Sequence, residues 1–171
     1  MKYLALCIMC KDEHLYLKEN IDYHTLLGVD HFLIYDNGSN PPLAPTFKNY
    51  PNVTVENWSD KERGSHGRCF KFCLEKYRGS FQWIGFIDTD EFIVLKKGST
   101  NLKEFLKGYG RFGGLGIQWK CFGASGHKKQ PPNVIQSYLH AAGTKDDDHI
   151  KTIVQTKYTV NSRGPHCFSY V

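Results

Sequence analysis

One segment in the middle of the chain constrains the fold more than any other. Residues 82–87 form an apolar run of strand length, and three carboxylates, Asp88, Asp90 and Glu91, follow within four positions. A buried strand tolerates unpaired charge only where it leaves the sheet, so these acids are expected at an exposed strand end. Ligands of open α/β sheets collect at the carboxyl ends of the strands. The segment therefore predicts a strand that delivers acids to a ligand-binding edge.

The two aspartates of this segment suggest a metal site. Asp88 and Asp90 are expected on the same side of an extended backbone, because side chains alternate along it with a period of two. Two carboxylates on one side suit Mg²⁺ or Mn²⁺, and such an ion commonly bridges to phosphate. A solvated acidic turn after the strand is the alternative that the pattern leaves open.

Strands and helices are expected to alternate along the rest of the chain. We expect strands at residues 3–10, 31–35, 53–56, 82–87, 113–120 and within 149–160, and helices at 13–27, 66–78 and 101–107. This order and the short connections predict an α/β sandwich, with a mostly parallel central sheet flanked by helices, in a single domain. The chain stops shortly after His166, so residues beyond this sequence are expected to complete the fold.

Local signals refine this prediction. Ser65 and Asn101 are expected to cap the helices that follow them. Four prolines between residues 41 and 51 argue against regular helix there. Residues 121–149 are rich in Gly, Lys, Pro and Asp, which indicates a mobile surface with one short helix or strand near 133–140.

Composition excludes several classes of protein. The net charge of +5 is modest, and Lys and Arg form no dense stripe, which argues against a nucleic-acid partner. No apolar stretch reaches the roughly 20 residues that cross a bilayer, so we expect a cytoplasmic protein and leave peripheral contact with the inner face of a membrane open. Six cysteines fit reduced thiols in such a compartment. Cys7 and Cys10 point to opposite faces of their strand, which argues against a shared zinc ion.

Polar groups follow three of the expected strands. They are Lys11-Asp12-Glu13, Asp36-Asn37-Gly38-Ser39 and Asp88-Thr89-Asp90-Glu91. Parallel strands would place all three turns at one edge of the sheet, where nucleotide clefts form. The sequence contains neither of the common glycine-rich phosphate loops. A divalent metal is then the natural means of holding a diphosphate.

Several of these blocks resemble one enzyme family. Cys10-Lys11-Asp12-Glu13, Tyr35-Asp36-Asn37-Gly38-Ser39, Trp83 to Phe92 and Trp119 with Phe122-Gly123-Ala124-Ser125-Gly126 are similar, in this order, to family-92 glycosyltransferases and their family-2-like relatives. The resemblance implies a GT-A fold that uses Mn²⁺ or Mg²⁺ to move a sugar from a UDP-sugar donor to a glycan, lipid-linked glycan or other hydroxyl acceptor. Residues 63–70 depart from the pattern, because similar sequences carry a glutamine near the start of this helix.

The resemblance also implies roles for individual residues. Asp36 would accept a hydrogen bond from the uracil or ribose, and Glu13 would hold the ribose. Asp88 would face the ribose or the water shell of the metal, and Asp90 would ligate the metal directly. His166 is the candidate third ligand of the metal. Apart from the resemblance, which fails at residues 63–70, the charge of Arg68 could reach the diphosphate.

The catalytic base is the least defined part of this prediction. An inverting transferase needs a carboxylate near the acceptor hydroxyl, and the weak candidates are Asp146, Asp147 and Asp148. A retaining enzyme would need none, and the sequence does not choose between the two. Two alternatives stay open: a sugar-nucleotide pyrophosphorylase or other nucleotidyltransferase, and a non-catalytic module that binds a nucleotide sugar. The acidic turn at Lys11-Asp12-Glu13, without glycine, argues against the first.

Overall fold

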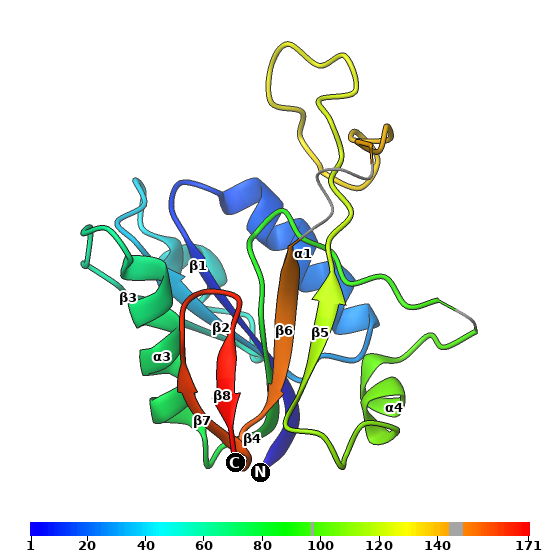
Figure 1. Ribbon diagram of the computed structural model, residues 1–171. Coiled ribbons are helices and arrows are strands. Elements are labelled where there is room, and N and C mark those ends of the chain that lie inside the picture. Colours follow the sequence, from blue (N-terminus) through cyan, green and yellow to red (C-terminus); the bar gives the residue numbers. More distant parts are fainter. Residues whose placement is uncertain (97, 144–148) are drawn as a thin grey trace.

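The computed structural model describes residues 1–96, 98–143 and 149–171. Within these ranges the chain forms a six-stranded sheet of order β3-β2-β1-β4-β6-β5 (Figure 1). The strands are β1 (Lys2–Cys10), β2 (His31–Asp36), β3 (Val53–Asn57), β4 (Phe81–Phe86), β5 (Gly114–Gln118) and β6 (Ile150–Gln155). The first four are mutually parallel, whereas β6 runs antiparallel to both β4 and β5. The expected mostly parallel sheet is thus confirmed.

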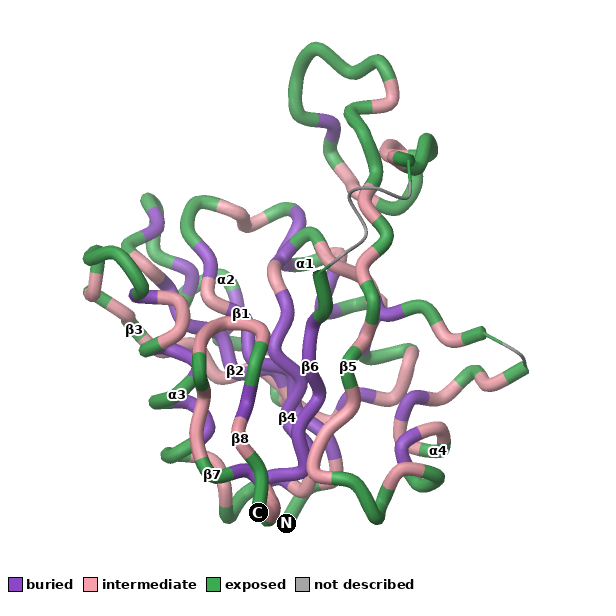
Figure 2. The backbone as a smooth tube through the Cα atoms, in the orientation of Figure 1, coloured by how far each residue is buried: buried purple, intermediate pink, exposed green. Residues whose placement is uncertain are grey.

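Helices cover both faces of the sheet. They are α1 (His14–Leu26), α2 (Leu43–Phe47), α3 (Ser65–Tyr77) and α4 (Leu102–Lys107). Leu17 of α1 and Leu106 of α4 share one apolar cluster with Leu6 and Trp83 of the sheet. On the other face, α3 and the hairpin of β7 (Thr159–Ser162) and β8 (Phe168–Tyr170) cover a second cluster. The result is a three-layer sandwich in which buried residues concentrate in the central strands (Figure 2).

Burial on both faces explains the composition of the central strands. In β1, Leu4 to Ile8 are completely inaccessible to solvent, so the strand is a continuous apolar run without alternation. The parallel strands end at one edge of the sheet, at the top of Figure 1, and both termini of the described chain lie at the opposite edge. A long arm, residues 119–143, leaves β5 at the upper edge (Figure 1).

The structure corrects three local predictions. A short helix, α2, forms in the proline-rich segment, because Pro45 lies in its first turn, where a backbone N–H has no partner within the helix. Ser65 does not cap α3: Gly64 is the N-cap, in a left-handed conformation, and the Ser65 hydroxyl donates to the Asp60 carbonyl oxygen instead. Residues 133–140 form neither helix nor strand. The cap at Asn101 is confirmed, since its side chain accepts hydrogen bonds from two amides of α4.

The arm is anchored to α1. The Glu19 carboxylate accepts hydrogen bonds from the backbone amides of Val134 and Ile135, at 2.6 and 3.1 Å. The Tyr16 hydroxyl donates to the Pro131 carbonyl oxygen and contacts the Tyr138 hydroxyl, at 3.1 Å in both cases. These contacts hold the arm over the helix that also supports the acidic turn described below. No helix of the described residues is long and apolar enough to span a membrane.

Candidate functional site

The acidic turn lies at the carboxyl end of β4, beside the ends of β1 and β2. In the parallel register, Cys10 of β1 lies opposite Asp36 of β2, and Cys7 lies opposite Phe86 of β4. A cleft of about 460 Å³ opens at this edge. It is lined by Met9, Cys10, Lys11, Glu13, Asn37, His66, Asp88, Thr89 and Asp90. The three polar turns that the sequence singled out therefore meet in one cleft.

Asp88 and Asp90 share the cleft for a reason other than the expected one. The strand ends at Phe86, and residues 88–91 form a turn in which the Glu91 amide donates to the Asp88 carbonyl oxygen. The Glu91 carboxylate closes the same turn by accepting from the Asp88 amide at 2.8 Å. The turn, and not strand alternation, directs both aspartates into the cleft. Asp88 is half-buried and Asp90 is exposed.

Buried polar side chains of α1 hold this turn in place. The Asn20 side-chain amide donates to the carbonyl oxygens of Thr89 and Glu91, at 3.0 and 2.8 Å. The Tyr23 hydroxyl donates to the Ile93 carbonyl oxygen at 2.8 Å, and Nε2 of His24 accepts from the Ile93 amide at 3.1 Å. Buried backbone groups of a loop need such partners. Helix α1 therefore fixes the position of the two aspartates.

His24 is the core histidine that its place on an apolar helical stripe indicates. It is inaccessible to solvent, and its Nδ1 lies 2.9 Å from the Asn20 carbonyl oxygen. With Nδ1–H donating there, Nε2 is left as the acceptor for the Ile93 amide. Burial lowers the pKa of His24 to about 4. The imidazole is therefore neutral at pH 7, as its two hydrogen bonds require.

Lys151 is a central residue of the site that the sequence analysis missed. Its side chain is only 4% exposed. The ammonium lies 2.6 Å from Oδ2 of Asp88 and 3.3 Å from Oε2 of Glu91. It also lies 5.3 Å from the centre of the Trp119 ring. The available signal was a single charge within the otherwise apolar stretch 150–154, since a buried strand accepts a lysine only where it finds a partner.

Two histidines near Asp88 keep a buried ring nitrogen without a partner in the described part of the chain. Nε2 of His66, on α3, lies 3.4 Å from Oδ1 of Asp88, too far for a good hydrogen bond. Nε2 of His66 and Nδ1 of His166 are buried without a hydrogen-bond partner among the described residues. Burial lowers the pKa of both imidazoles, and for His166 the charge of Lys151 lowers it further. Both rings are thus neutral at pH 7 and keep a lone pair for a ligand.

Glu13 and Glu91 are perturbed carboxylates next to the two aspartates. Burial, followed by repulsion from Asp90 and Asp88, raises the pKa of Glu13, and the nearby polar side chain of Thr89 opposes this shift. Burial and the charge of Asp88 raise the pKa of Glu91 to about 7, although Lys151 favours its ionised form. Such shifts are common where acids converge on a binding site.

The Asp36 carboxylate organises the loop that follows β2. One oxygen of its buried carboxylate accepts from the Ser39 amide at 2.8 Å, and the other accepts from the Leu43 amide at 2.9 Å. The Ser39 hydroxyl in turn accepts from the Asp12 amide at 2.9 Å. These hydrogen bonds lower the pKa of Asp36 against the effect of burial. Asp36 does not line the cleft, whereas its neighbour Asn37 does; contact of Asp36 with a nucleotide stays a prediction.

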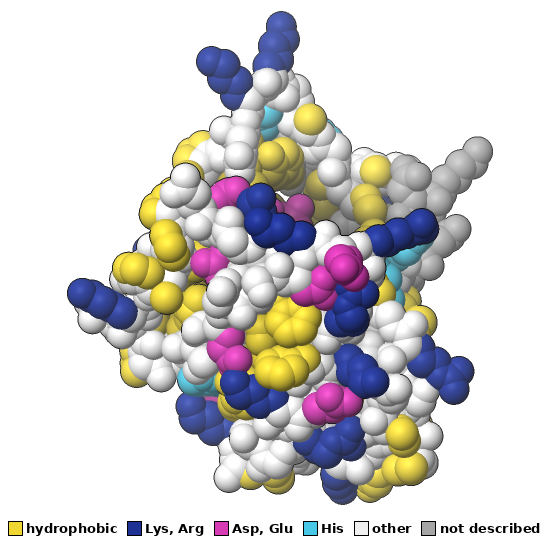
Figure 3. Space-filling model, turned by 90° about the vertical axis from the view of Figure 1, so that its left-hand side faces the viewer, with side chains coloured by type: hydrophobic (Ala, Val, Ile, Leu, Met, Phe, Trp, Pro, Cys, Tyr) yellow, Lys and Arg dark blue, Asp and Glu magenta, His cyan; other side chains and the backbone are white. Residues whose placement is uncertain are grey.

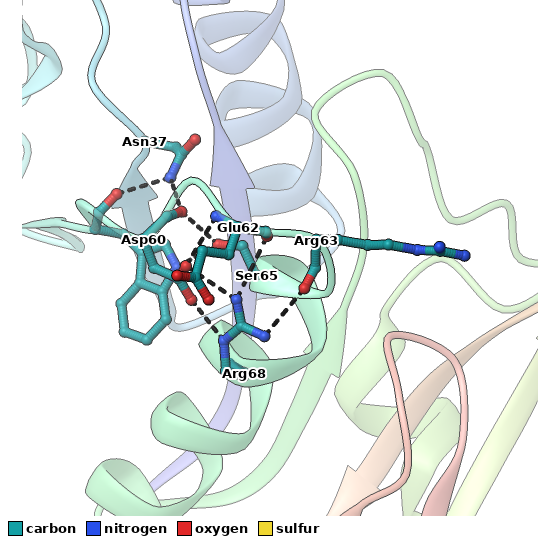
Figure 4. A network of polar contacts seen from close by, with 7 residues as sticks. Asn37, Asp60, Glu62, Arg63, Ser65 and Arg68 are labelled. Carbon is teal, nitrogen blue, oxygen red and sulfur yellow. Dashed lines mark hydrogen bonds and ion pairs between the residues drawn. The ribbon is translucent and has the colours of Figure 1, made fainter.

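Arg68 is engaged away from the cleft. Its guanidinium binds the Asp60 carboxylate through two hydrogen bonds, of 2.6 and 2.9 Å, and also donates to the carbonyl oxygens of Glu62 and Arg63 (Figure 4). This network folds the loop that precedes α3, so the predicted contact of Arg68 with a diphosphate does not match its position. The side chain of Arg63 points away from the network in Figure 4. Asp146, Asp147 and Asp148, the candidate bases, lie outside the described residues.

The donor atoms at the cleft fit a divalent metal without forming a finished site. Among the described residues, no three His, Cys, Asp or Glu side chains come together closely enough to hold an ion. Carboxylate oxygens of Asp88 and Asp90 and the two unpartnered imidazole nitrogens are nevertheless ligands that Mn²⁺ accepts. Nε2 of His66 lies 3.4 Å from one oxygen of Asp88, and Lys151 holds the other oxygen.

Comparison with known proteins identifies the family. The family described as Glycosyltransferase family 92 matches residues 2–168. The chain belongs to glycosyltransferase family 92. Proteins of this family from Oryza sativa subsp. japonica and Ricinus communis are 33% and 31% identical to it, each over 75% of the chain. The match covers 23% and 24% of their own lengths, so this chain spans about a quarter of these curated relatives.

Solved structures confirm the fold of this family 92 chain. The 4-diphosphocytidyl-2C-methyl-D-erythritol synthase of Anaerococcus prevotii superposes with a TM-score of 0.52 over 91% of this chain and 71% of its own, at 9% identity. At this identity the likeness shows the fold alone, and it agrees with the predicted GT-A sandwich. A Pyrobaculum calidifontis mannosyltransferase in complex with GDP-Man and Mn²⁺ covers 60% of this chain and 32% of its own, at 14% identity and a TM-score of 0.43, too low to carry an argument.

Proposed function

We propose that this domain binds a UDP-sugar together with Mn²⁺ or Mg²⁺ and transfers the sugar to a hydroxyl group of a glycan or lipid-linked glycan. The observation that carries the proposal is the convergence of Glu13, Asp88 and Asp90 in one cleft, at the carboxyl ends of parallel strands. Membership of a glycosyltransferase family supports the reaction class. The need for a metal rests on the acids of the cleft, and the choice of UDP rests on the resemblance to family-92 glycosyltransferases.

The residues of the cleft divide between the metal and the nucleoside. Asp90 is exposed and forms no ion pair within the described part of the chain, so its carboxylate is free to ligate an ion. Asp88 and the unpartnered nitrogen of His166 are the proposed further ligands. A bound divalent ion would act as a Lewis acid that neutralises the leaving diphosphate. Glu13, half-buried beside Asp90, would accept hydrogen bonds from a ribose.

The cleft also favours a compact polar ligand over an apolar one. Its walls carry Lys11, Asn37 and His66 in addition to the acids. The Asn37 side-chain amide is fixed by hydrogen bonds to the carbonyl oxygens of Trp58 and Asp60, at 2.7 and 2.8 Å. On the face that carries β3 and α3, acidic and basic side chains are interspersed (Figure 3). This surface lacks the continuous basic patch that a nucleic-acid partner would require.

A thermal-shift screen tests the proposal. UDP, GDP and CDP, and then a panel of UDP-sugars, are added with and without Mn²⁺. A ligand present at 100 times its Kd stabilises the folded state by about 2.7 kcal/mol. We expect stabilisation by UDP that requires the metal. Release of UDP from the stabilising UDP-sugar on addition of a hydroxyl acceptor would then show transfer. Absence of metal-dependent stabilisation by any of the nucleotides would overturn the proposal.

A further inference from the structure

The position of Lys151 has a consequence for metal binding. Lys151 lies on β6, which pairs antiparallel with β4, and Phe86 of β4 is opposite Thr152. This register places Lys151 just beyond the end of β4, next to the acidic turn. Its ammonium then lies 2.6 Å from Asp88, a short charge-assisted hydrogen bond. A positive charge therefore lies against the carboxylate that a divalent ion would use.

We propose that Lys151 is a positioning residue that holds Asp88 while the site contains no divalent cation, and that it competes with the cation for this carboxylate. The inference rests on the proposed function, because it assigns Lys151 a part in loading the same site. A cation and an ammonium cannot both approach the Asp88 carboxylate closely without mutual repulsion in a partly buried site. In this proposal, the repulsion displaces the ammonium from Asp88 when the ion binds.

The surroundings of Lys151 make this displacement possible. Oε2 of Glu91 lies 3.3 Å from the ammonium, so one carboxylate remains as a partner after Asp88 turns to the metal. The ring of Trp119, 5.3 Å away, offers a further favourable contact for a cation. Leaving a buried lysine without any partner would strongly destabilise the folded protein. With Glu91 and Trp119 in place, the positive charge of Lys151 has a favourable partner both before and after the metal binds.

The free histidine nitrogens agree with this two-state arrangement. Nε2 of His66 lies 3.4 Å from Oδ1 of Asp88 and has no hydrogen-bond partner within the described ranges. Nδ1 of His166 is likewise buried and unpartnered there. Buried polar atoms in folded proteins normally have partners. Nε2 of His66 borders the carboxylate that the ammonium already holds, as expected of a ligand whose bonds are completed only when the metal enters.

The test measures Mn²⁺ binding by the whole domain, without nucleotide, by electron paramagnetic resonance of the free ion. In Lys151→Met we expect the Kd for Mn²⁺ to fall by about tenfold, which is 1.4 kcal/mol, because the competing charge is gone. Lys151→Arg keeps the charge and should bind Mn²⁺ as the wild type does. The matched control is Lys103→Met, which removes a half-buried lysine 2.8 Å from Asp30, a residue that does not line the cleft.

Lys151→Met leaves the carboxylates of Asp88 and Glu91 without their positive partner, and this could prevent folding. A second variant keeps the proposal testable in that case. Lys151→Met with Glu91→Gln removes one charge of each sign and keeps an oxygen that can accept from the Asp88 amide. It should also bind Mn²⁺ more tightly than the wild type. Unchanged or weaker binding in the folded variants would overturn the role of Lys151 while leaving the proposed function intact. Failure of the wild type to bind Mn²⁺ even with UDP would overturn both.

Discussion

Protonation of His24 should destabilise the domain in a defined pH window. The imidazole is inaccessible to solvent and bridges α1 to the backbone that follows the acidic turn. Its pKa in the folded chain is about 4, lowered by burial, against about 6.5 in an unfolded chain. The unfolded state therefore binds a proton more readily between these values, and the free energy of unfolding falls as the pH falls from about 6.5 towards 4.

The size of the effect follows from the two pKa values. A shift of about 2.5 units corresponds to about 3.4 kcal/mol at 1.36 kcal/mol per unit. The full loss of stability develops only below the folded pKa, so acidification from pH 7 to pH 5 lowers the free energy of unfolding by about 2 kcal/mol. The stabilisation by neutral His24 is present above pH 6.5 and is lost as the pH falls.

Urea unfolding of the wild type and of His24→Gln measures this contribution. Glutamine has no group that titrates in this range, so the difference in stability between the two proteins should shrink by about 2 kcal/mol from pH 7 to pH 5. Other titrating groups affect both proteins equally and cancel in the difference. Parallel pH curves for the two proteins would refute the assignment of His24 as a buried neutral histidine that holds the turn.

Two further substitutions test the packing and the assignment of the loops. Gly85→Ala places a Cβ atom 2.6 Å from the buried Leu6 side chain. It should lower the free energy of unfolding, measured by urea titration, by about 1–3 kcal/mol. An unchanged free energy of unfolding would show that the neighbouring side chains make room for the added methyl group. Arg68→Ala removes the two hydrogen bonds to Asp60 and should leave the affinity for UDP with Mn²⁺ unchanged in calorimetry. A large loss of affinity would return Arg68 to the donor site.

The sheet and its polar edge could be predicted because they depend on local patterns. Apolar runs of strand length that end in acids mark buried parallel strands, and the parallel direction brings their ends together. The helix capped by Asn101 was predictable for a similar reason, since one side chain satisfies two amides within the next turn. The Ser65 hydroxyl found a different partner, the Asp60 carbonyl oxygen, because the preceding loop folds back on itself.

The site was only partly predictable because several partners are distant in sequence. Lys151 and Asp88 are 63 positions apart, and only the antiparallel pairing of β6 with β4 brings them together. The role of Asn20 depends on the packing of α1 against a loop about 70 residues later. Asp36 looked like a nucleotide ligand in sequence, yet both its oxygens serve nearby amides. Spacing along the chain reports neither the contact of Lys151 with Asp88 nor that of Asn20 with the loop.

The most direct test of the account is calorimetric titration of UDP into the wild type and into Asp90→Ala, each with and without Mn²⁺. The exposed Asp90 carboxylate, in the acidic turn, lines the cleft, and its removal should spare the fold. We predict that the wild type binds UDP only with the metal, and that Asp90→Ala retains the melting temperature of the ligand-free protein but loses this binding. Equal affinity for UDP in the two proteins, or binding that ignores Mn²⁺, would contradict a metal-assisted diphosphate site in this cleft.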